Sequence, residues 1–108
     1  MFKQIVFHPD VAEDIKGAYL WYEKQLLGLG DRFLLELEDG YIAIINFPNS
    51  WANSQYGFKR YILNKFPFSI IYKIINNQIM IISVMHNSRK PNYWQGIVTG
   101  KQIGRAHV

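Results

Sequence analysis

The amino-acid sequence predicts an α+β fold in which two helices pack on one face of a sheet. From Val11 to Ile45, apolar residues recur every three or four positions, as on the buried stripe of an amphipathic helix. From Phe58 to Met85, short β-branched and aromatic runs are typical of strands. The expected order is an N-terminal strand, an antiparallel helical hairpin and then a three-stranded antiparallel sheet.

The first expected elements are a short strand and a long helix. Residues 2–7 are rich in strand-forming residues, and successive side chains alternate between the two faces of the expected strand. Pro9 suits the first position of a helix, and Glu13 and Asp14 favour the positive end of its dipole. The helix is expected to stop at the glycines of Gly28-Leu29-Gly30.

The second helix is predicted from about Asp31 to Asn46. It ends there because Pro48 disfavours helical geometry at Phe47. The short glycine turn before it implies that the two helices are antiparallel. Residues 48–56 are rich in Asn and Ser, and we expect them to form a loop.

Three strands follow, which we expect at 58–64, 68–75 and 78–85. Asn76-Asn77 is the expected two-residue turn between the last two strands, because asparagine tolerates positive φ. The last strand is apolar on both faces, which indicates a central position in the sheet.

Length and composition exclude several classes of protein and of functional site. The 108 residues suit one domain, expected over 1–95, with 96–108 as a tail that is either disordered or derived from a cloning vector. The absence of cysteine excludes disulfides, thiolate metal sites and cysteine nucleophiles. Neither a metal-ligand cluster nor a glycine-rich phosphate loop is recognisable, so no cofactor is expected. Without a secretory signal or a membrane-spanning run, a cytoplasmic location is expected.

Charge is divided unevenly along the chain. All eight acidic residues lie between Asp10 and Asp39, which gives the first 39 residues a net charge of −4. From Gly40 onward there are eight Lys or Arg residues and no acid, a net charge of +8. This division indicates a basic surface for RNA, DNA or an acidic protein partner. The alternative is a solvated basic surface that binds nothing.

Three segments carry a resemblance to a known family. They are FHPDVAEDIKGAYLWYEKQLLGLGDRFLLEL, GFKRYILNKFPFSIIYKI and ISVMHNSRKPNYW. In this order and spacing they resemble toxins of the RelE/ParE superfamily of type II toxin–antitoxin systems, over roughly residues 2–95. The resemblance implies the same strand–hairpin–sheet fold and a cognate antitoxin as partner. The assembly it implies is either a homodimer or a toxin–antitoxin hetero-oligomer.

The same resemblance leaves the activity open between classes. One branch of the superfamily cleaves messenger RNA on the ribosome, and another poisons DNA gyrase without chemistry of its own. A third possibility is a degenerate module that acts only as a co-repressor with its antitoxin.

Metal-free RNA cleavage requires a base, an acid and cations that stabilise the phosphate. The candidate catalytic residues are Lys59, Arg60, His86, Arg89 and Tyr93, and the candidate target-binding residues are Lys65, Lys73, Lys90 and Trp94. Lys59 and Arg60 are adjacent on a strand and point to opposite faces, so only one can share a cleft with His86.

Four of the candidates also have a structural interpretation. His86 follows a buried strand and suits a histidine that hydrogen-bonds to backbone. Arg89 could pair with an early acid, and Tyr93 and Trp94 could pack on a sheet edge.

Two positions depart from the ribonuclease branch. Ser69 and Asn87 stand where that branch carries arginines, whereas Tyr93 matches its C-terminal tyrosine. Each lost charge-assisted contact is worth on the order of 1.5–3 kcal/mol. Gyrase inhibition is therefore the alternative to RNA cleavage.

Overall fold

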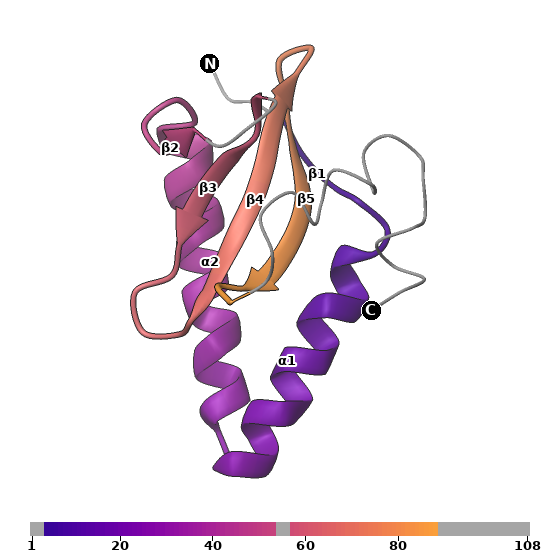
Figure 1. Cartoon of the computed structure of the whole chain (residues 1–108), viewed down its shortest axis with the longest axis vertical. Coiled ribbons are helices and arrows are strands. Elements are labelled where there is room, and N and C mark those ends of the chain that lie inside the picture. Colours follow the sequence, from indigo (N-terminus) through magenta and orange to yellow (C-terminus); the bar gives the residue numbers. More distant parts are fainter. Residues whose placement is uncertain (1–3, 54–56, 89–108) are drawn as a thin grey trace.

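The computed structural model describes residues 4–53 and 57–88. The helices and strands appear in the order strand, helix, helix and then four strands (Figure 1). Their bounds are β1 Gln4–Phe7, α1 Val11–Gln25, α2 Leu29–Asn46, β2 Ala52–Asn53, β3 Lys59–Ile62, β4 Phe68–Ile75 and β5 Gln78–His86. The predicted α+β architecture is confirmed. Arg89, Lys90, Tyr93, Trp94 and the 96–108 tail lie outside the described residues.

The strands join in one mixed sheet of order β1-β5-β4-β3-β2. β1 runs parallel to β5, with Gln4 opposite Gln78 and Phe7 opposite Ile81, and the other neighbours are antiparallel. The predicted antiparallel arrangement of three strands is confirmed for β3, β4 and β5, but the sheet as a whole is mixed, because β1 joins it parallel to β5. The chain between β1 and β5, which contains both helices and strands β2 to β4, provides the long connection that a parallel pair requires.

A short strand also lies inside the segment expected to be a loop. Ala52 and Asn53 of β2 pair antiparallel with Arg60 and Lys59 of β3. Asparagine and serine content predicted a loop at 48–56, but two residues at a sheet edge need little strand propensity when a neighbouring strand supplies the hydrogen bonds.

The helical hairpin is tied together by the carboxylate of Glu23 at the end of α1. It accepts hydrogen bonds from the backbone N–H groups of Gly28 (3.1 Å), Gly30 (2.8 Å) and Asp31 (3.3 Å). Gly28 adopts φ 90°, a left-handed conformation that glycine reaches without strain. The carboxylate satisfies N–H groups that the start of α2 leaves without helical partners, so α2 begins at Leu29 rather than at Asp31.

A second carboxylate joins α2 to the sheet. Glu36 accepts hydrogen bonds from the backbone N–H groups of Asn64 and Lys65 in the turn between β3 and β4, the latter at 3.0 Å. Hydrogen bonds to a charged acceptor contribute more than neutral ones, about 1.5–3 kcal/mol when well shielded and less at an exposed position such as this. The turn is thereby held against the helix.

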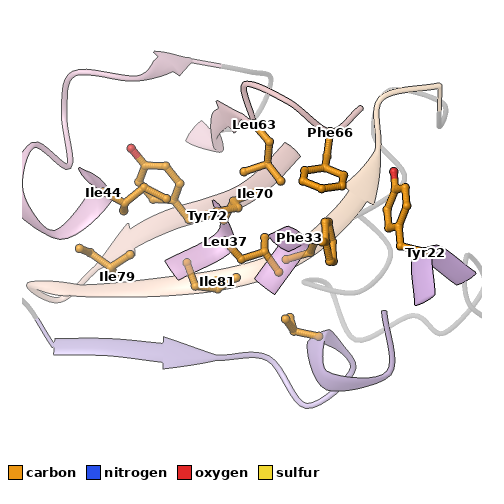
Figure 2. Packing of buried hydrophobic residues seen from close by; sticks show 12 residues of the cluster. Tyr22, Phe33, Leu37, Ile44, Leu63, Phe66, Ile70, Tyr72, Ile79 and Ile81 are labelled. Atoms are coloured by element: carbon orange, nitrogen blue, oxygen red, sulfur yellow. The ribbon is translucent and has the colours of Figure 1, made fainter. Parts of the chain in front are cut away.

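Both helices pack on the same face of the sheet. Val11 and Tyr22 of α1 and Phe33, Leu37 and Ile44 of α2 are buried in one cluster with β4 and β5 (Figure 2). Rings of Tyr22, Phe33 and Phe66 pack edge-on or tilted, with centroids 4.9–5.4 Å apart. The predicted placement of the helices on a single face is confirmed.

A smaller apolar cluster lies on the face that the helices do not cover, here called the helix-free face. Phe58, Ile71, Ile82 and Met85 are only 0–6% exposed there. β4 and β5 are thus buried on both faces, as the two-sided apolar pattern of 78–85 indicates.

The turn between β4 and β5 has the predicted asparagine pair. Asn76 and Asn77 adopt φ 49° and 64°, the left-handed values that a tight hairpin turn requires. The register then shifts between Ile71 and Tyr72, so that Ile82 is an extra residue on β5. Within the described ranges, neither helix is long and apolar enough to span a bilayer.

Two helix glycines should respond oppositely to alanine. An added Cβ at Gly17 of α1 meets nothing within 4 Å, whereas one at Gly40 of α2 would lie 2.7 Å from Ile70 Cδ1. We expect Gly17→Ala to raise the free energy of unfolding by up to about 1 kcal/mol, through helix propensity. Gly40→Ala should lower it by about 1–3 kcal/mol through overpacking. Urea denaturation measures both, and equal shifts for the two variants would contradict this packing.

Alkaline pH should destabilise the chain through two tyrosines. Burial raises the pKa of Tyr41 and Tyr72 from 10.0 to about 12. Because each ring stays neutral in the folded chain where the unfolded chain ionises, the stabilisation is complete below pH 10 and is lost as pH rises toward 12. Tyr72→Phe should reduce this pH-dependent loss, since one of the two groups with the largest shifts is removed. Denaturant midpoints measured between neutral and alkaline pH give the loss of stability with pH. A loss in Tyr72→Phe equal to that of the unsubstituted chain would contradict the assignment.

Candidate functional site

A guanidinium held by two neutral side chains forms the candidate site. Arg60 Nε donates to Ser69 Oγ at 2.9 Å, and Arg60 Nη2 donates to Asn87 Oδ1 at 3.3 Å. The Ser69 hydroxyl donates in turn to Asn87 Oδ1 at 2.6 Å. These three residues, here called the Arg60 site, form a closed set of hydrogen bonds.

Three neighbouring strands position these residues. Arg60 lies opposite Ile71 in the β3–β4 pair, and Ser69 lies opposite Met85 in the β4–β5 pair. Ile71 and Met85 belong to the helix-free cluster, so Arg60 and Ser69 share that face. Asn87 directly follows β5, and its backbone N–H donates to Pro67 O at 2.8 Å, which fixes the chain beside the start of β4.

The charge of Arg60 is not neutralised by its partners. Ser69 is fully buried and Arg60 is half-buried, and both acceptors of the guanidinium are neutral oxygens. In the part of the chain that the structure describes, Arg60 forms no ion pair with a carboxylate. A guanidinium has five N–H donors, so it can still hold a carboxylate or phosphate in two-pronged geometry. The site can therefore bind an anionic group.

The other described cations are spread around the sheet. Lys73 shares the helix-free face, with its Nζ 5.2 Å from the centroid of the Phe58 ring. Lys59 points to the opposite side from Arg60, and its Nζ donates to Asn53 Oδ1 at 2.7 Å. Lys65 lies in the β3–β4 turn that Glu36 holds. Of these three, Lys73 alone extends the basic surface of the Arg60 site.

His86 lies on the other face of the sheet. It is opposite Phe68, with the two ring centroids 5.2 Å apart in an edge-on contact, and Phe68 packs on the helix-side core. Its Nδ1 accepts the Ser88 N–H at 3.1 Å and lies 2.8 Å from the Ser88 hydroxyl. This matches the structural interpretation of a histidine that hydrogen-bonds to backbone at a strand end.

The predicted catalytic set is therefore not assembled among the described residues. Arg60 and His86 occupy opposite faces, Lys59 is turned away from Arg60, and the Arg89 and Tyr93 assignments fall outside the description. Beside Arg60, the described side chains are a hydroxyl and an amide, which cannot act as general base or acid near neutral pH. Anion binding is the chemistry that this arrangement supports.

Metal binding has no support in the described ranges, where no three His, Asp or Glu side chains are grouped as ligands. The hydrogen-bonding roles of Ser69 and Asn87 are what residue-based reasoning missed. Both positions were singled out only for lacking a charge. The alternation of side chains along the strands places Arg60 and Ser69 on the same face of the sheet, with Asn87 at the end of the next strand. This pattern is the signal that could have identified the three residues as one site.

Comparisons with known proteins agree with this fold. A family model described as the ParE toxin of the type II toxin–antitoxin system parDE matches residues 5–91. A solved chain from the chromosomal ParDE toxin–antitoxin system of P. aeruginosa superposes with a TM-score of 0.69 at 15% identity. That superposition covers 78% of this chain and 95% of the other. The comparison with curated proteins gave no match.

Removing the Ser69 hydroxyl should loosen Arg60. We expect Ser69→Ala to lower the free energy of unfolding by about 1–2 kcal/mol, because Arg60 Nε and Asn87 Oδ1 each lose a partner. Ser50→Ala, at an exposed position, is the matched control and should change it by less than about 0.5 kcal/mol. Chemical denaturation gives both values, and equal effects would show that the Ser69 hydroxyl is not part of a stabilising set.

Proposed function

Because the chain belongs to the ParE toxin family of type II toxin–antitoxin systems, we propose that it inhibits bacterial growth by binding DNA gyrase, without cleaving RNA. The observation that carries this proposal is the Arg60 site. A charged, preorganised guanidinium there has neutral oxygens as its partners and no described acid or base beside it. Such a site suits recognition of an anionic group on a target better than bond cleavage.

The working surface of the proposal is the helix-free face around Arg60 and Lys73. Both belong to the acid-free part of the sequence, so the field there is positive. A carboxylate of a protein target would form a bidentate pair of hydrogen bonds with Arg60. The ammonium group of Lys73 would add a second positive charge. The cytoplasm, where DNA gyrase works, is the proposed location.

Neutralisation belongs to the cognate antitoxin. The helical hairpin exposes large apolar side chains: Leu20, Trp21, Leu27, Leu35 and Ile42 are 48–89% exposed. Five large apolar side chains exposed on one helical hairpin favour an interaction surface there. We propose that the antitoxin covers part of this hairpin in a toxin–antitoxin hetero-oligomer, as an amphipathic helix would.

Ribosome-dependent mRNA cleavage is the second candidate. One observation favours it: Arg60 contacts Asn87, and Arg89 and Tyr93 follow Asn87 within six positions of the sequence. Those two side chains would supply a second cation and a proton donor if they lie beside Arg60.

Induction of the chain in bacteria separates the candidates. Gyrase inhibition predicts loss of supercoiling by purified gyrase and no discrete cuts in primer extension on translated mRNA. Arg60→Gln should weaken inhibition of supercoiling about tenfold or more, because one charge-assisted contact is lost.

Arg32→Gln is the control, since it removes an exposed arginine at the start of α2, away from the Arg60 site. Discrete cuts at codons, together with normal supercoiling, would contradict gyrase inhibition and support RNA cleavage. Neither effect, together with normal growth, would leave only the co-repressor role.

A further inference from the structure

His86 and Ser88 form a second pair of polar side chains, separate from the Arg60 site. The His86 imidazole lies on the helix side of the sheet, and its Nδ1 accepts the backbone N–H of Ser88 at 3.1 Å. The Ser88 hydroxyl oxygen lies 2.8 Å from the same nitrogen. Both residues are exposed, where the chain leaves β5. A reagent in solution can therefore reach the pair.

The backbone hydrogen bond decides the direction of the hydrogen bond between the two side chains. A ring nitrogen that accepts an N–H carries a lone pair and no proton, so the neutral His86 ring holds its proton on Nε2. The Ser88 hydroxyl is then the donor, and its proton points at His86 Nδ1. A hydroxyl that donates to an imidazole base in this way is the arrangement of an activated serine nucleophile.

The other described histidine makes the same backbone contact without a serine. His8 Nδ1 accepts the N–H of Asp10, also two positions further along the chain, at 3.1 Å. The side chain at that position is a carboxylic acid and offers no hydroxyl nucleophile. The backbone contact therefore does not itself require a serine, and His8 is an internal control for the His86 pair.

His86 also lines a cleft of about 300 Å³ between α1 and the sheet. The Phe68 ring contacts the imidazole edge-on, with centroids 5.2 Å apart, and helps to hold it in place. Across the cleft, an added Cβ at Gly17 meets nothing within 4 Å, so α1 leaves open space there. Glu13 and Asp14 make this wall acidic, which opposes a phosphate dianion but not a neutral acyl group.

We propose that Ser88 is a nucleophile that takes an acyl group from a thioester or an activated ester, with His86 as its base and the acyl chain in the cleft. A bond forms between Ser88 Oγ and the carbonyl carbon of the donor. The bond from that carbon to the leaving sulfur or oxygen breaks, and its electron pair departs with the leaving group. The hydroxyl proton passes to His86 Nδ1. This chemistry is independent of the proposed inhibition of gyrase.

Two backbone N–H groups beside the nucleophile already have acceptors. Asn87 donates to Pro67 O at 2.8 Å, and Ser88 donates to His86 Nδ1. Neither is available to hold the oxyanion of a tetrahedral intermediate, so both the attack and the later hydrolysis are slower than in a serine hydrolase. The expected product is a lasting ester on Ser88, which makes the residue a modification site.

Reaction of the full chain with p-nitrophenyl hexanoate tests the pair, with peptide mass spectrometry to locate and time the ester. Ser88 should be acylated about tenfold faster or more than Ser50, an exposed serine outside the cleft. His86→Gln should slow acylation of Ser88 about a hundredfold, because the base is lost, whereas His8→Gln should leave it unchanged. Equal rates at Ser88 and Ser50, or an undiminished rate in His86→Gln, would overturn the proposal.

The length of the acyl chain tests its placement in the cleft. Gly17→Leu fills the open space on α1 and should slow acylation by p-nitrophenyl hexanoate about tenfold, while the rate with p-nitrophenyl acetate stays the same. Lys16→Leu adds the same side chain at a neighbouring exposed position outside the cleft, and should react as the parent does with both esters. A Gly17→Leu chain that takes hexanoate at the parent rate would overturn the placement of the acyl chain.

Discussion

The antiparallel pairing of β4 with β5 is the interaction on which the rest of the structure depends. Both strands are buried on both sides, with Ile70, Ile71, Ile81 and Ile82 at 0–1% exposure. The helix-side core rests on one face of this pair, and the Phe58 cluster rests on the other. The pair also brings Ser69 and Asn87 together, so a slip of one residue in register would dismantle the core and the Arg60 site at once.

The division of charge along the sequence has a structural counterpart. Two of the acids in the first part serve backbone N–H groups: Glu23 at the start of α2 and Glu36 in the β3–β4 turn. Carboxylates in these roles hold the hairpin and the sheet together instead of pairing with the basic residues after Gly40. Arg60 is consequently oriented by a serine and an asparagine, and its positive charge is retained for a partner.

Periodicity was sufficient to predict both helices and every strand except β2, and also that the helices cover one face of the sheet. The stripe of the second helix, with Phe33, Leu37 and Ile44, directly reports burial on one face. Pairing is different, because the placement of β1 beside β5 depends on a contact between residues far apart in sequence, which local patterns do not encode. The Arg60 site was half predicted for the same reason. Its cation was identified, but Ser69 and Asn87 were noted only for lacking a charge, and their hydrogen bonds to Arg60 join segments that are apart in sequence.

The parallel pairing of β1 with β5 also orders events during synthesis. Gln4 and Gln78, whose side chains are hydrogen-bonded at 3.2 Å, are 74 positions apart. Closing so long a loop costs entropy before any contact repays it, so this edge forms late in folding. Residues 4–7 must wait until nearly the whole sheet has left the ribosome, because their partner strand is the last described one. A nascent chain therefore carries its helical hairpin well before it has a complete sheet, and activity that depends on the sheet begins only after β5 has been synthesised.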